Sequence, residues 1–179
     1  MTLEPFRGRQ PQIDPSAFVH PRATLIGDVR IGPEASVWPG AVLRADWNHI
    51  IVGAATSIQD NAVVHVTDSG PTTIGAMCVV GHLAFLEECE VGDACLVGVG
   101  ARILNGSRME EGSVAAAQTV LLGGMTVPSG QRAQGIPAKI VVPPEPPREH
   151  TESGARVYVE NCRLMLAEQR ARSGRQHIR

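Results

Sequence analysis

Two histidines and a nearby carboxylate are the residues of this sequence whose types and spacing could do chemistry. The stretch 64–97 contains His65, then His82 in a Gly-His pair, then Glu87 and Glu88 five and six residues further on. Two imidazoles and one carboxylate form the ligand set of a catalytic divalent metal that keeps a fourth position open. The same spacing also fits two unliganded polar histidines, so the residues alone leave both interpretations open.

A six-residue repeat is the element that must position these side chains. The aliphatic residues of the repeat are Val19, Leu25, Ile31, Val37, Leu43, Val52, Ile58, Val64, Ile74, Val80, Val91, Val97, Ile103, Met109, Ala115, Leu121 and Val127. The residue after each is often Gly, and the residue four positions later is mostly small. This pattern predicts an all-β solenoid, a triangular prism of roughly six coils with about eighteen residues per coil. An ordinary β-sandwich is the competing interpretation.

The sequence predicts that the chain has five segments. Residues 1–18 are expected to be irregular, because three prolines there prevent a long helix. The solenoid is predicted over 19–142, followed by a Pro-rich linker at 143–150 and a helix at 151–172. An apolar stripe through Tyr158 indicates that the helix packs on the prism or on a neighbouring subunit. The tail 173–179 is expected to be disordered.

The composition excludes several functional classes. The 179 residues carry a net charge of −2, which gives no general attraction to nucleic acid or to an anionic membrane. No apolar run is long enough to span a bilayer, and the N-terminus lacks an apolar signal core, so a cytoplasmic protein is expected. The four cysteines form no CxxC pair. Two of them, Cys78 and Cys95, fall on small-residue positions and are predicted to be buried and reduced.

A second polar group should join the histidines. Successive coils bring residues about eighteen apart into register, so Arg44 and Asp46 can lie beside Gln59, Asp60 and His65. This group is too polar for an ordinary core. A solvated corner with surface salt bridges is the alternative.

At these residues the sequence resembles the γ-class carbonic anhydrases. The matching stretches are LRADWNHI, SIQDNAVVHVT, TTIGAMCVVGHLAFLEECEVGDACLVGVGARIL and GIPAKIV, followed by the helix with Tyr158, and they cover about residues 10–170. The resemblance implies a left-handed parallel β-helix, assembled as a homotrimer with Zn, Fe or Co between subunits. It also implies that CO2 and bicarbonate are the substrates.

The resemblance assigns roles residue by residue. His65 matches the first metal ligand and His82 the second, and they would come from neighbouring subunits. The family's third histidine is replaced here by Glu87, which therefore either takes the third ligand position on the subunit of His65 or leaves it empty. The remaining site residues that the family implies are Gln59, Arg44, Asp46, Asp60 and Tyr158. The acidic loop that follows the first histidine in the family's archetype is missing, with only Asp68 in its place.

The function expected from these residues is reversible hydration of CO2 by a metal-bound hydroxide. A carboxylate in place of an imidazole lowers the site's charge by one unit and should make that hydroxide harder to form at neutral pH. Two alternatives stay open, since a fold does not determine a function. One is a hexapeptide acyltransferase or CoA-thioesterase. The other is a non-catalytic trimer that serves as a scaffold or binds a small ligand of the siderophore type.

Overall fold

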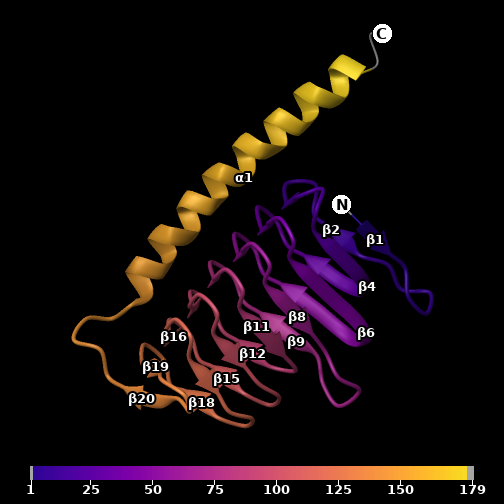
Figure 1. The fold of residues 1–179 in the computed structure, drawn as a ribbon. Helices are drawn as coiled ribbons and strands as arrows, with labels where there is room; N and C mark the ends of the chain where they lie inside the picture. Colours follow the sequence, from indigo (N-terminus) through magenta and orange to yellow (C-terminus); the bar gives the residue numbers. More distant parts are fainter. Residues whose placement is uncertain (1, 177–179) are drawn as a thin grey trace.

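The chain forms a parallel β-solenoid with one long helix along its side (Figure 1). The computed structural model describes residues 2–176, and the backbone only of residues 170 and 172–176. The strands stack into about seven turns. The predicted left-handed β-helix of hexapeptide repeats is thereby confirmed, with one turn more than the aliphatic series indicated.

The prism has three faces, here called A, B and C. Face A carries the first halves of β4 (Thr24–Ile31) and β6 (Val42–Val52), then β8 (Val63–His65), β11 (Phe85–Glu87), β14 (Arg102–Ile103) and β17 (Val120–Leu121). Face B carries the second halves of β4 and β6, then β9 (Thr72–Ile74), β12 (Glu90–Val91), β15 (Arg108–Met109) and β18 (Thr126–Val127). Face C carries β3 (Phe18–Val19), β5 (Ser36–Val37), β7 (Ser57–Ile58), β10 (Val79–Val80), β13 (Leu96–Val97), β16 (Val114–Ala115), β19 (Arg132–Gln134) and the antiparallel β20 (Lys139–Val141).

The aliphatic residues of the repeat fill the axis of the prism. Leu43, Val64, Leu86, Ile103 and Leu121 follow one another down face A, and all are fully buried. Each coil donates backbone hydrogen bonds to the next, which satisfies the peptide groups of strands only two or three residues long. Apolar burial and the parallel ladder together make each coil a rigid platform for the side chains at its corners.

Two strands bend around a corner without a break. The strands β4 and β6 each run from face A to face B, and Gly27 stands at the bend of β4 with a φ of +78°. A Cβ atom on Gly27 would lie 2.2 Å from the carbonyl oxygen of Ala45, so only glycine fits there. The extra residues of β6 between Ala45 and Ile50 form a bulge opposite Asp28. This bulge carries Asp46.

The N-terminal segment is more regular than its prolines suggested. Residues Thr2–Glu4 form β1 and residues Gln12–Ile13 form β2, and both pair in parallel with β4. The expectation of an irregular segment over 1–18 was therefore wrong for these residues. The reason is that Pro5, Pro11 and Pro15 lie outside the strands, where no ladder hydrogen bond is required of them.

The helix α1 spans Arg148–Gln176 and packs along face C. It starts three residues before the predicted 151, because Thr151 already donates its backbone N–H to Pro147 and so belongs to the first turn. The helix also continues through 173–176, where a tail was expected, while residues 177–179 lie outside the described part. The ring of Tyr158 on α1 packs on the ring of Trp38, with 5.9 Å between the ring centroids. Within the described residues, no helix is long and apolar enough to cross a membrane.

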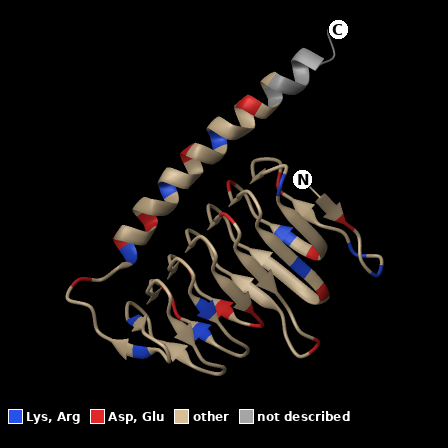
Figure 2. Cartoon of the chain, viewed as in Figure 1, with Lys and Arg blue, Asp and Glu red and all other residues tan. Residues whose placement is uncertain are grey.

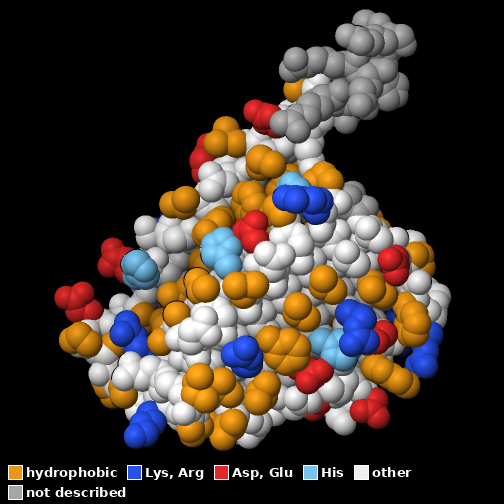
Figure 3. All heavy atoms as spheres, in the orientation of Figure 1, with side chains coloured by type: hydrophobic (Ala, Val, Ile, Leu, Met, Phe, Trp, Pro, Cys, Tyr) orange, Lys and Arg blue, Asp and Glu red, His pale blue; other side chains and the backbone are white. Residues whose placement is uncertain are grey.

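Acidic and basic residues are interspersed along both the coils and the helix (Figure 2). In the space-filling view, exposed apolar side chains lie between charged residues and histidines on the face turned to the viewer (Figure 3). Leu83 and Val99 are among the exposed apolar residues, and both lie at the corner between faces C and A. This corner also holds His82.

Candidate metal centre

His65 lies between two carboxylates at the corner between faces A and B. Its Nδ1 is 2.6 Å from Oε1 of Glu87, and its Nε2 is 3.2 Å from Oδ1 of Asp46. The backbone register brings these groups together, because Arg44, His65 and Glu87 are partners in three successive coils. The His65 side chain is only 15% exposed, so its two nitrogens are served by these carboxylates rather than by bulk water.

Arg44 holds the far oxygen of Asp46. The guanidinium Nη1 forms an ion pair with Oδ2 of Asp46, which leaves Oδ1 directed toward His65. Burial on its own raises the pKa of the Asp46 carboxyl. A backbone hydrogen bond at Asp46, the charge of Arg44 and the contact with His65 outweigh that effect, so the pKa of Asp46 lies below its ordinary value. Asp46 is therefore an anion at neutral pH.

His82 occupies the corner between faces C and A. Its Nδ1 lies 3.0 Å from Oδ2 of Asp60 in the preceding coil, and its backbone N–H donates to Oε1 of Gln59 at 3.1 Å. The Gln59 side chain is buried, whereas 47% of the His82 side chain is exposed. An open pocket of about 380 Å³ lies beside Asp60 and is lined also by Arg22 and Asn61.

The two histidines stand at opposite edges of face A. Strand β11 begins beside the corner that holds His82 and ends at Glu87, the register partner of His65. It has three residues, and three residues of strand span about 10 Å. Ligands of one ion lie about 2 Å from it, so this separation is too large for His82 and His65 of one subunit to share a metal. Among the described residues of one chain, no group of three or more His, Cys, Asp or Glu side chains is arranged so that it could hold a metal ion by itself.

Comparison with known proteins shows the family of this chain. No family model matches the chain. It is 37% identical to the carnitine operon protein CaiE of Escherichia coli K12 over 79% of this chain and 72% of that protein. It is 42% identical to the mitochondrial γ carbonic anhydrase 2 of Arabidopsis thaliana over 74% of this chain and 50% of that protein. The chain belongs to the γ-class carbonic anhydrase-like family of hexapeptide-repeat proteins.

A solved structure of a similar protein has the same fold. The hexapeptide transferase family protein from Anaplasma phagocytophilum superposes with a TM-score of 0.87 at 40% identity, over 90% of this chain and 96% of that chain. The present chain spans about half the length of the Arabidopsis carbonic anhydrases that it matches. The relatives therefore show a γ-class carbonic anhydrase-like family, and they leave the activity of this member to be argued from its site.

The donor chemistry of the site fits a divalent cation of this family. One edge of face A offers an imidazole with two carboxylates, and the other offers an imidazole with a carboxylate and an amide. Histidine and carboxylate ligands suit Zn, Fe and Co, and the sites of catalytic zinc include sets of two histidines and one carboxylate. Within one chain, the two edges lie too far apart to hold the same ion.

The predicted site residues lie in two separate groups, with Tyr158 on the helix. The structure brings Arg44, Asp46, His65 and Glu87 together at one corner, and Gln59, Asp60 and His82 at another. Tyr158 lies on α1 against Trp38, which is the register neighbour of Gln59 in the preceding coil. Sequence reasoning missed the pairing of each histidine with a carboxylate through Nδ1. Counting one coil between Asp60 and His82, and between His65 and Glu87, would have indicated both pairs.

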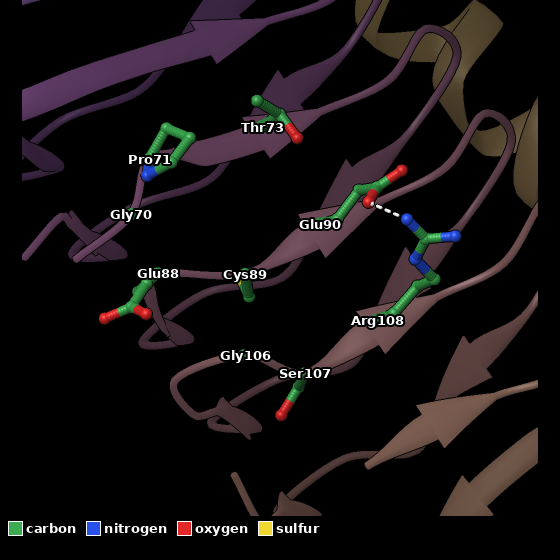
Figure 4. A pocket seen from close by; sticks show the side chains of 9 residues that line it. All are labelled: Gly70, Pro71, Thr73, Glu88, Cys89, Glu90, Gly106, Ser107 and Arg108. Carbon is green, nitrogen blue, oxygen red and sulfur yellow. Dashed lines mark hydrogen bonds and ion pairs between the residues drawn. The ribbon is translucent and has the colours of Figure 1, made fainter. Parts of the chain in front are cut away.

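A third feature near the site is a groove on face B, shown in Figure 4. It holds about 290 Å³, with Glu88 at one end and the ion pair of Glu90 with Arg108 at the other. The Glu88 carboxylate already accepts hydrogen bonds from Thr67 and Asn105. None of the predicted site residues lines this groove.

Proposed function

We propose that this chain is a γ-class carbonic anhydrase-like enzyme that hydrates CO2 reversibly at a divalent metal site between the subunits of a homotrimer. The observation that carries the proposal is the placement of His65 and His82 at opposite edges of one face, each with a carboxylate on Nδ1. In a closed ring of identical subunits, the His65 edge of one subunit meets the His82 edge of the next. Three such interfaces would give three equivalent sites.

The chain's own residues would divide the work at this site. His65, together with His82 of the neighbouring subunit, would hold the ion, and the ion would supply the Lewis acidity that lowers the pKa of water. Gln59 uses its Oε1 to accept the backbone N–H of His82, which leaves its amide NH2 able to donate a hydrogen bond. Arg44 keeps Asp46 in place through the ion pair. Zn, Fe and Co are all compatible with these donors.

A carboxylate among the protein ligands should shift the activity toward alkaline pH. It makes the site more negative by one charge than the three-histidine set of the family, so water at the site stays neutral up to a higher pH. We therefore expect slow CO2 hydration at pH 7 that increases as the pH rises. The aqueous cytoplasm remains the compartment predicted from the sequence.

Metal content and CO2 hydration of protein purified without a histidine tag test the proposal. Stopped-flow hydration assays from pH 6.5 to 9.5 should show activity in the wild type after loading with Zn²⁺, Fe²⁺ or Co²⁺. The His65→Ala and His82→Ala variants should each lose the metal and at least 100-fold of that activity. A wild-type trimer that binds none of the three ions would contradict the proposal.

An acyltransferase is the second candidate, because the similar structure from Anaplasma is described as a hexapeptide transferase family protein. Such an enzyme needs a cleft for the arm of CoA. Calorimetric titration of the trimer with acetyl-CoA separates the two functions. Tight binding that survives the His65→Ala substitution would favour the transferase.

A further inference from the structure

Both histidines of the site use Nδ1 in the same way. His65 directs Nδ1 at Glu87 of the following coil, and His82 directs Nδ1 at Asp60 of the preceding coil. A histidine that binds metal through one nitrogen generally donates its other N–H to a carboxylate or carbonyl, which fixes the ring and its tautomer. Each ring thus presents Nε2 as its metal-binding nitrogen, and Glu87 stands where Asp60 stands in the other pair.

The spacing at Nε2 of His65 fits a cation shared with Asp46. Nδ1 lies 2.6 Å from Oε1 of Glu87, so Nε2 is the ring nitrogen that faces Oδ1 of Asp46, at 3.2 Å. Two ligand atoms on a tetrahedral zinc ion lie about 3.4 Å apart, which is close to the spacing found here.

The surroundings of Asp46 favour the same arrangement. Arg44 holds Oδ2 and leaves Oδ1 available on the side of His65. Asp46 reaches this place because the bulge of β6 displaces it from the ladder, one residue beyond the last pair with β4 before the shift. Oε1 of Glu87, by contrast, is already committed to Nδ1 at 2.6 Å.

We infer that Asp46, not Glu87, is the carboxylate ligand of the metal, and that Glu87 is a positioning residue that orients His65. The ligand set is then His65 Nε2 and Asp46 Oδ1 of one subunit with His82 of its neighbour. The inference rests on the proposed metal site. It changes the role of the residue that replaces the family's third histidine, since Glu87 supports a ligand instead of being one.

Cobalt binding to two conservative variants tests the assignment. Asp46→Asn removes the anionic ligand, and Glu87→Gln keeps an oxygen that can accept the N–H of His65. We expect Glu87→Gln to bind one Co²⁺ per subunit within about 10-fold of the wild-type affinity and with the same visible spectrum. Asp46→Asn should lose more than 100-fold in affinity, and Asp46→His should recover most of it. Glu90→Gln is the control, because Glu90 pairs with Arg108 on face B.

A measurement on the metal-free protein gives an independent readout. Nitrogen-15 spectra of labelled imidazole should show His65 protonated on Nδ1 in the wild type and in Glu87→Gln. Replacement by leucine, which accepts no hydrogen bond, should shift the ring toward the other tautomer. An orienting effect also predicts a 10- to 100-fold loss of Co²⁺ affinity in Glu87→Leu.

Co²⁺ binding by Glu87→Gln and Asp46→Asn shows which of the two carboxylates is the ligand. If Glu87→Gln loses the Co²⁺ and its spectrum while Asp46→Asn keeps them, Glu87 is the ligand and the inference is wrong, although the proposed metal enzyme stands. Retention of full affinity in both variants also overturns the inference. A wild-type trimer without Co²⁺ affinity overturns the inference together with the proposed function.

Discussion

Asp60 and His82 lie one coil apart, and their side chains meet with 3.0 Å between Oδ2 and Nδ1. The contact fixes a ring that is otherwise half exposed at the edge of face A. In the proposed metal site, this preset orientation of His82 would lower the entropy lost on metal binding.

Removal of this carboxylate should weaken the metal site without abolishing it. We expect Asp60→Ala to bind Zn²⁺ 10- to 100-fold more weakly than the wild type, because outer partners of metal-binding histidines have effects of this size. Competition with a chromophoric chelator measures the affinity. Asp68→Ala removes an exposed carboxylate in the loop after His65 and should change nothing. Equal affinities for wild type and Asp60→Ala would disprove the orienting role.

A charge next to His82 should separate the subunits. Leu83 is 62% exposed at the corner where we place the interface, and burial against a neighbour would remove an apolar side chain from water. We expect Leu83→Glu to sediment near 19.0 kDa, the mass of one chain, and to bind no metal. The matched control is Leu164→Glu on the helix, at 57% exposure. Trimers of Leu83→Glu, or monomers of the control, would place the interface elsewhere.

The tight corners should tolerate no added methyl group. A Cβ on Gly53 would lie 2.4 Å from the carbonyl carbon of Gly75, and backbone of a stacked coil cannot yield as a flexible side chain can. Gly53→Ala should therefore lower the free energy of unfolding by about 3 kcal/mol. Gly124→Ala meets no atom within 4 Å and should cost only about 1 kcal/mol for its φ of +73°. Urea denaturation compares the two, and equal losses would show that the coils can spread.

Thiol reagents should react slowly with the cysteines of the prism. Burial raises the pKa of Cys89 to about 12, and Cys78 and Cys95 are buried as well. Only the thiolate reacts, and a thiol with this pKa is about one part in 10⁴ ionised at pH 8. We expect the labelling of the native protein to take hours and to speed up with pH, whereas unfolded protein should react within minutes. Rapid labelling of Cys89 at pH 8 would show that its coil opens.

The repeat made the fold predictable because each aliphatic position has one physical role. Residues such as Leu25, Ile58 and Ile103 are fully buried, as the six-residue period required. Strand β1 carried no such signal, since it pairs with β4 through backbone groups while its side chains remain exposed. Backbone pairing at the edge of a sheet leaves little mark in the sequence.

The register that pairs His65 with Glu87 was predictable from the repeat, but the contacts between side-chain atoms were not. The spacing of His65 and Glu87 places them one coil apart, and the coil register follows from the repeat. Which nitrogen of His65 meets which carboxylate depends on side-chain rotamers and on the bulge that carries Asp46. Those depend on local packing, which the period of the repeat does not contain.

The most direct test of a site shared between subunits is complementation between two inactive variants. His65→Ala and His82→Ala would be co-expressed with two different non-histidine affinity tags, and mixed trimers isolated by purification on both. In a ring of three, every mixed trimer has one interface with both histidines intact. The account predicts about one bound metal ion per mixed trimer and none in either parent, against about three in the wild type. Mixed trimers without metal, or a parent variant that retains it, would contradict a metal site formed by His65 of one subunit and His82 of the next.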